Sequence, residues 1–184
     1  MRKAPARRRS TRALELSRIA GALLAAGLIG AQVFMAAAAA RTFPIPSERP
    51  VASVEIPDSW RPALAPDGVE GSANNGAVHL AVEFVAASDV DTAAAKAMER
   101  LAERGVALAP ETKRSAARRF NGLDALKVDF SGTDSNGESE ITLILVAVPR
   151  KPGFVAICYW GDDEAQESVG NDLQSIADSI QASK

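Results

Sequence analysis

The chain lacks most of the side chains on which enzyme chemistry depends. Its 184 residues include a single cysteine, Cys158, and a single histidine, His79. Because one cysteine forms no disulfide within a chain, an apolar core has to stabilise the fold. Any cysteine–histidine pair must consist of Cys158 and His79, and a serine triad would need His79 as its base.

The sequence also lacks the short motifs of the common enzyme classes. It contains no G-x-S-x-G, S-x-x-K, P-loop, G-x-G-x-x-G, C-x-x-C or H-E-x-x-H pattern. The sequence therefore contains none of the motifs that usually indicate a hydrolase, a nucleotide-binding protein or a zinc site. We predict a protein without enzymatic activity, and we assign it no catalytic, cofactor-binding or metal-binding residue.

The overall composition is typical of one globular domain. Apolar residues make up 47% of the chain, charged residues of both signs make up 24%, and aromatic residues make up 5%. This composition excludes collagen-like, coiled-coil, disulfide-scaffold and wholly disordered chains.

Charge is distributed unevenly along the chain. Residues 1–40 contain seven Lys or Arg and one acidic residue, whereas residues 41–184 contain fourteen basic and twenty-two acidic residues. The basic start, the apolar run over residues 19–40 and the three alanines before Arg41 match a secretory signal peptide. We predict cleavage after Ala40, which would leave 144 residues, and an exported protein that is periplasmic or associated with the cell envelope.

An uncleaved membrane anchor is the alternative for the same segment. Its twenty-two residues could cross a hydrocarbon core of about 30 Å as a helix. Three glycines and an ending of the A-x-A type favour cleavage instead. Membrane contact is expected only if the segment stays uncleaved. The acidic balance of residues 41–184 argues against a nucleic-acid partner.

The exported part begins with strand and loop patterns. Residues 41–50 carry three prolines and predict an extended lead-in, so that a single domain covers residues 51–184. A short strand is predicted at residues 51–56. Residues 61–76 predict a loop, with at most a short edge strand near Val69.

A strand and a helix follow in the middle of the chain. Residues 78–87 alternate between apolar and polar side chains, which predicts a strand with one buried face. Ser88 or Asp91 can cap a helix that runs to about Arg104 and ends at Gly105.

Three hairpins and a helix complete the predicted domain. Asn121-Gly122 joins strands at residues 113–120 and 123–130, because a type I′ turn needs positive φ at both central residues. The remaining elements follow in chain order: a turn at 132–137, a strand at 141–148, a turn at 149–153, a strand at 154–160 and a helix at 163–181.

The strands at residues 141–148 and 154–160 carry apolar side chains on both faces. Such strands have to be covered on both sides, so we expect them to be central in the sheet. The connections are hairpins, and only two amphipathic helices are available. We therefore predict an α+β fold in which a mainly antiparallel sheet has helices on both faces, an α/β/α sandwich.

The order of these elements resembles the PsbP-like (Mog/PsbP) sandwich superfamily. The resemblance covers roughly residues 50–181 and rests on three short segments: Ile56-Pro57-Asp58-Ser59-Trp60, Asn121-Gly122-Leu123-Asp124-Ala125 and Ile176-Ala177-Asp178-Ser179-Ile180. It implies a domain of the mostly noncatalytic kind, found in a photosystem assembly protein, a Ran-binding protein and bacterial exported modules. Function does not transfer with such a fold, and no functional residue of the family maps onto this chain.

The side chains that could perform chemistry have simple structural interpretations. We expect His79 to be a half-exposed strand residue and Cys158 to be a buried, inert thiol. Two acidic groups resemble metal ligands, but a solvated hairpin loop and a helix N-terminus explain them without a metal. These groups are Asp134, Asn136 and Glu138 in the loop, and Asp162, Asp163, Glu164 and Glu167 at the helix start.

One cluster of positive charge stands out in the acidic part of the chain. It consists of Lys113, Arg114, Arg118 and Arg119, within seven positions. Charge that keeps an edge strand from pairing with other sheets would explain it. A docking patch for an acidic partner or a lipid surface is the functional alternative.

The sequence leaves two hypotheses for function. The first is a noncatalytic exported protein that binds a protein or assembly partner in the cell envelope through a sheet edge or a loop face. The second is a protein that binds a small apolar ligand or a lipid in a space lined by Trp60, Met98 and Trp160.

Overall fold

The computed structural model of the chain describes residues 39–149 and 151–183. The predicted signal segment falls outside these residues, apart from Ala39 and Ala40. No helix in the described residues is long and apolar enough to cross a membrane.

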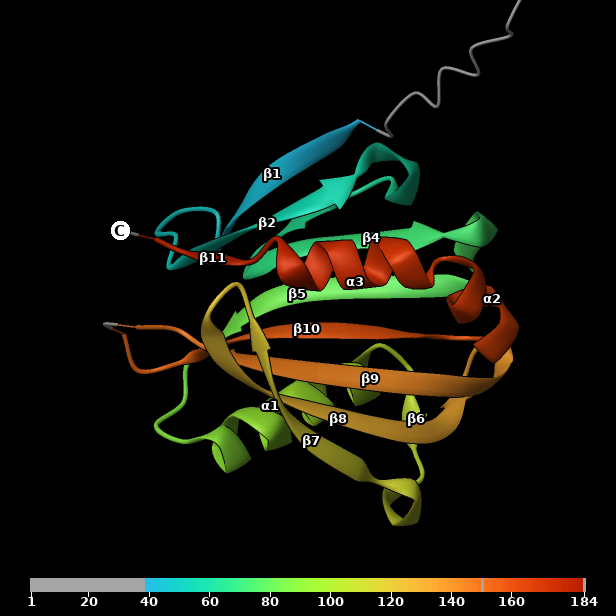
Figure 1. The fold of residues 1–184 in the computed structure, drawn as a ribbon. Helices are drawn as coiled ribbons and strands as arrows, with labels where there is room; N and C mark the ends of the chain where they lie inside the picture. The colour runs from blue at the N-terminus through green and yellow to red at the C-terminus, as the bar shows by residue number, and fades with distance from the viewer. Residues whose placement is uncertain (1–38, 150, 184) are drawn as a thin grey trace, which may run out of the picture. The chain divides into compact units, whose positions relative to one another are not determined.

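An eight-stranded sheet is the largest element (Figure 1). Its strands are β3 (Ala63–Ala65), β4 (Gly68–Ala73), β5 (Val78–Val85), β6 (Ala107–Leu108), β7 (Arg114–Phe120), β8 (Leu123–Asp134), β9 (Gly137–Ala147) and β10 (Phe154–Gly161). They lie in the order β3-β4-β5-β10-β9-β8-β6, and β7 also pairs with β8. Every pairing between described strands is antiparallel, so the predicted α+β fold with a mainly antiparallel sheet is confirmed.

A second, three-stranded sheet contains both ends of the described chain. It consists of β1 (Ala40–Ile45), β2 (Ala52–Pro57) and β11 (Gln181–Ala182). We expected residues 41–50 to be a lead-in before the domain, but β1 pairs with β2 along its whole length. Phe43 and Ile45 are buried there. Pro44 is tolerated because β1 is an edge strand, where a missing N–H breaks no ladder.

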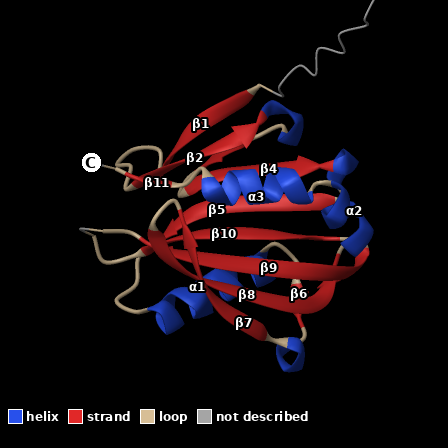
Figure 2. Ribbon diagram, viewed as in Figure 1, coloured by secondary structure: helices blue, strands red, loops and turns tan. Residues whose placement is uncertain are grey.

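The described residues also form three α-helices (Figure 2). They are α1 (Val90–Glu103), α2 (Asp163–Ser168) and α3 (Gly170–Asp178). Asp89 caps α1, in place of the expected Ser88 or Asp91, and accepts a hydrogen bond from the backbone N–H of Thr92 at 2.8 Å. This bond, with those from the Ser88 and Thr92 hydroxyls, lowers the pKa of Asp89.

The single helix predicted at residues 163–181 is wrong. The helix is interrupted between α2 and α3 at Val169, whose ψ of 13° is not helical. The last residues form β11 instead. Ser179 fixes this ending, because its hydroxyl accepts a hydrogen bond from the backbone N–H of Glu55 in β2 at 2.8 Å. Such a long-range contact has no local sequence signal.

Two apolar clusters cover the two faces of the central strands. Leu143 and Leu145 of β9 belong to the cluster that includes α1. Ile144 and Val146 belong to the cluster that includes α3 and β2. Successive side chains of a strand point to opposite faces, so β9 is buried on both sides. The predicted central position of β9 and β10 is confirmed, since each lies between two other strands.

The segment predicted as a loop at residues 61–76 contains β3 and β4. Its glycines suggested a loop, but two of them are required by close packing. A Cβ at Gly68 would overlap the carbonyl oxygen of Val82, and a Cβ at Gly71 would lie 2.9 Å from the carbonyl oxygen of Trp60. Glycine at these two positions therefore lets β4 pack closely against its neighbours. It does not mark a flexible loop.

Burial of β9 predicts a large stability effect at Leu145. The Leu145→Ala substitution removes a side chain that is 1% exposed, and such truncations cost about 2–5 kcal/mol in free energy of unfolding. Leu64→Ala is the matched control, since Leu64 is 64% exposed and its change should be within about 0.5 kcal/mol. Urea denaturation measures both, and equal losses would contradict the assignment of the core.

Candidate functional site

The four predicted basic residues lie at one edge of the eight-stranded sheet. Lys113 precedes β7, and Arg114, Arg118 and Arg119 lie on β7 itself; all four are exposed. β7 pairs with β8 and with no other described strand, so its second edge has no backbone partner among these residues. Positive charge therefore lines an open strand edge.

The alternation of β7 divides this charge between two faces of the strand. Arg119 lies opposite Asp124 of β8 and pairs with it, at 2.8 Å between Nε and Oδ1. Both side chains are largely exposed, so this pair contributes little to stability. Arg118 points to the other face, and its Nη1 donates to the carbonyl of Ala117 at 3.1 Å. Within the described part of the chain, the other three basic side chains form no ion pair.

A groove of about 470 Å³ opens beside α3 and next to β7. Its lining, which includes Arg118, Phe120, Lys127, Tyr159, Leu173 and Gln174, defines what we term the α3 groove. Among the lining residues, the sequence pointed to Arg118 and to Arg119, which also lines the groove, as functional candidates. Lys127 and Tyr159 gave no signal, because isolated polar residues are ordinary in a half-buried strand.

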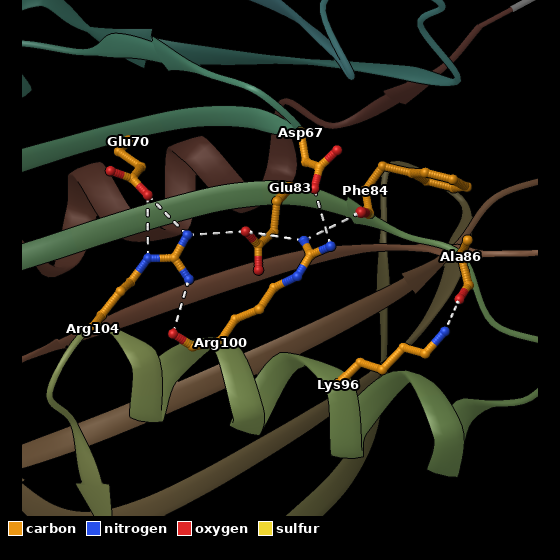
Figure 3. Close-up of polar contacts among 8 residues, drawn as sticks. All are labelled: Asp67, Glu70, Glu83, Phe84, Ala86, Lys96, Arg100 and Arg104. Atoms are coloured by element: carbon orange, nitrogen blue, oxygen red, sulfur yellow. Dashed lines mark hydrogen bonds and ion pairs between the residues drawn. The ribbon is translucent and has the colours of Figure 1, made fainter.

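Five charged side chains form a second cluster, between α1 and strands β4 and β5 (Figure 3). The side chain of Glu83 is only 7% exposed, and its Oε2 lies 3.2 Å from Arg100 and 3.0 Å from Arg104. Arg100 also pairs with Asp67 at 3.1 Å. Arg104 also pairs with Glu70 at 2.8 Å. We term this set the Glu83 cluster.

The Glu83 cluster anchors α1 to the sheet. Arg100 and Arg104 are four residues apart and so share a face of the helix, which lets both reach one carboxylate of β5. Burial lowers the pKa of Arg104, but hydrogen bonds with Glu70 and the charge of Glu83 outweigh burial and raise it. The guanidinium of Arg104 therefore stays charged, and the ion pairs of Arg100 and Arg104 hold the helix in place. The cluster has no local sequence signal, because its acids and arginines are far apart along the chain.

His79 and Cys158 lie in different surroundings and are not hydrogen-bonded to each other in the described residues. His79 is half-buried and stacks on the indole of Trp160, with ring centroids 5.3 Å apart. Cys158 is buried, and burial, together with the charge of Glu83, raises the pKa of its thiol to about 12. No hydrogen bond in the described residues joins the two side chains. The predicted half-exposed histidine and buried thiol are confirmed.

The two acidic groups make local backbone contacts. Asp134 Oδ1 accepts from the backbone N–H of Asn136 at 2.6 Å, which closes the hairpin loop. Asp162 Oδ1 accepts from the N–H of Ala165 at 2.9 Å and caps α2. In the described ranges, no group of three or more His, Cys, Asp or Glu side chains could hold a metal ion.

The three residues expected to line an apolar ligand site do not share a cavity. Trp60 is fully buried in the cluster that includes α3, and its Nε1 donates to Asp172 at 3.1 Å. Met98 and Trp160 belong to the cluster on the α1 side. The sheet separates these clusters, so the expected lining is wrong.

The arrangement of strands and helices is a PsbP-like fold. The solution structure of cyanobacterial PsbP (CyanoP) from Synechocystis matches it with a TM-score of 0.54, covering 85% of this chain and 100% of that chain at 10% identity. The crystal structure of LpqN from Mycobacterium tuberculosis, which is involved in cell envelope biogenesis, matches with a TM-score of 0.50, covering 79% and 92% at 14% identity. Such distant likeness establishes the fold alone. No protein-family model and no curated protein matches the sequence.

Removal of the central carboxylate should destabilise the protein strongly. The Glu83→Ala substitution leaves two partly buried arginines without their shared partner, and breaking a buried pair in this way costs about 3–5 kcal/mol. Glu99→Ala on α1 is the control, because Glu99 is exposed and its loss should change the free energy of unfolding by less than about 0.5 kcal/mol. If urea titrations give the two variants the same stability, the cluster does not anchor α1.

The raised pKa of Cys158 predicts a thiol that resists modification. With a pKa of about 12, roughly one thiol in ten thousand is ionised at about pH 8, and only the thiolate reacts. The folded protein should therefore show negligible labelling by a thiol-specific disulfide reagent over a period in which the urea-unfolded protein reacts completely. Rapid labelling of the folded protein would refute the buried, inert assignment.

Proposed function

We propose that the protein is a noncatalytic, exported domain of the cell envelope that binds a protein partner along the free edge of β7. The observation that carries this proposal is the open edge of β7 with its exposed basic side chains. An extended segment of a partner would add to the sheet through backbone hydrogen bonds, a common mode of peptide recognition.

The edge is the part of the sheet that is free to bind. We interpret α1 and α3 as the outer layers of an α/β/α sandwich, which leaves the sheet faces occupied. Among the described residues, Leu64 is the only large apolar side chain that is exposed. A partner would therefore bind through backbone and charged contacts rather than through a large apolar patch.

The charge of β7 selects an acidic partner. Arg114 lies at one end of the strand and Arg118 and Arg119 lie near the other. A second copy of this chain is disfavoured, because antiparallel pairing of two β7 strands would place arginines of one copy next to those of the other. An extended segment rich in Asp or Glu would instead meet opposite charges.

The sequence and one structural relative support the envelope location. Residues 1–40 have the charge and apolarity of an export signal. LpqN, which shares the fold, is involved in cell envelope biogenesis. A noncatalytic role is supported by the side chains themselves, since the thiol of the only cysteine is buried with a raised pKa and the only histidine stacks on Trp160.

Photo-crosslinking tests the partner surface. A photoreactive amino acid in place of the exposed Ser115 on β7 should give an adduct to an acidic segment of a partner in cells. The same amino acid at exposed position 49 is the control and should give no such adduct. Charge reversal by Arg118→Glu and Arg119→Glu should reduce the β7 adduct by about tenfold, because paired charges steer and hold the partner. Adducts that survive charge reversal, or that form equally at position 49, would contradict the proposal.

The intact mass of the protein from its envelope fraction tests export. We expect a chain that begins at Arg41 and has lost residues 1–40. Such cleavage would also remove the carbonyl of Ala39, which accepts a hydrogen bond from Asp58 at 2.7 Å. A chain that retains its full mass would favour the uncleaved anchor.

A further inference from the structure

The α3 groove gathers positive charge from two neighbouring strands. Arg118 on β7 and Lys127 on β8 lie on the same face of the sheet, because Ala116 is opposite Lys127 and Arg118 is two residues further along its strand. Both line the groove, and no Asp or Glu is among its lining residues. Arg119 is a third basic residue of the lining, and its side chain pairs with Asp124. A cavity with basic side chains and no lining carboxylate favours an anion.

Lys127 forms an ion pair within the protein, and its ammonium group still has a further hydrogen-bond donor. Its Nζ lies 2.7 Å from Oδ1 and 2.9 Å from Oδ2 of Asp129. Asp129 also accepts a hydrogen bond from Thr142 at 2.6 Å, which keeps that carboxylate in place. An ammonium group has three donors, so Lys127 can hold Asp129 and still donate into the groove.

Neutral donors complete the lining. Tyr159 is half-buried, and its hydroxyl makes no hydrogen bond with the described residues. α3 begins at Gly170, which also lines the groove, and no side chain caps this helix. The helix N-terminus adds partial positive charge at the same place.

The walls of the groove are set by tertiary contacts. The β7–β8 turn is tied to the end of the α3 segment, because Asn121 Nδ2 donates to the carbonyl of Ile180 at 3.0 Å. Phe120, Ile144 and Leu173 line the groove but are themselves almost fully buried. They offer little apolar surface to a ligand, so recognition depends on the polar groups.

We propose that the α3 groove binds an anionic group, a phosphate or carboxylate of a small organic molecule or of a lipid headgroup. Arg118 and Lys127 would donate charge-assisted hydrogen bonds to it, and the Tyr159 hydroxyl would donate a neutral one. The volume of about 470 Å³ is that of an ordinary small-molecule site. The groove shares Arg118 with the edge of β7, but this proposal also depends on Lys127 and Tyr159, which lie on other strands.

Titration with phenyl phosphate, followed by backbone amide NMR shifts, tests the groove. We expect saturable shifts at Lys127, Tyr159 and Gly170. Lys127→Gln should weaken binding by about tenfold, since it removes the charge but keeps a donor. Lys113→Gln removes the same charge outside the groove and should leave the affinity unchanged. Saturable shifts with this difference support the proposal.

Other outcomes overturn it. Absence of saturable shifts would show that the groove does not bind the anion. Equal weakening by Lys127→Gln and Lys113→Gln would show general charge attraction rather than a site. The same titration with phosphatidylglycerol vesicles, against phosphatidylcholine vesicles as the control, distinguishes the source of the anion. Groove shifts with phenyl phosphate alone identify a free anion, and groove shifts with anionic vesicles identify a lipid headgroup. Because Lys127 is not on β7, failure here leaves the crosslinking result at Ser115 unaffected.

Discussion

Two neighbouring strands, β9 and β10, bury apolar side chains on both faces, and the layers around them depend on this constraint. Leu143 and Leu145 need cover on one side, and Ile144 and Val146 need it on the other. The first pair belongs to an apolar cluster that includes residues of α1, and the second pair belongs to a cluster that includes residues of α3 and the three-stranded sheet. Because burial of apolar area is the main favourable term in folding, neither cover is dispensable.

The two covers are attached by different interactions. The helix α1 has a narrow apolar stripe, with Ala93, Ala97 and Leu101 fully buried, and the Glu83 cluster adds ion pairs at its C-terminal half. The other cover has a large apolar contact, with Trp60 and Ile176 buried in it. A buried carboxylate under α1 fixes the position of the helix as well as its stability, since Glu83 is matched only where both arginines reach it.

The outer strand β7 carries exposed positive charge. β7 lies beyond the covered strands, carries exposed arginines and borders the α3 groove, so the basic edge and the α3 groove share Arg118 and Arg119. They differ in which groups bind. The edge offers backbone donors and acceptors to an extended chain, whereas the groove offers Lys127 and Tyr159 to a small anion.

The sequence by itself determined the local elements and the outer strand's charge. Two-sided apolar runs predicted the central strands, and Asn121-Gly122 predicted a hairpin. Two acidic groups and a buried thiol were interpreted as structural residues. These signals are local, because side-chain alternation and turn conformation depend on neighbours in the chain. Only the tertiary structure decided that β1 and β11 join β2, that Gly68 and Gly71 belong to a strand, that Glu83 meets Arg100 and Arg104, and that Lys127 and Tyr159 border one groove. Each of these depends on residues far apart in sequence, whose contact follows from the packing of whole elements.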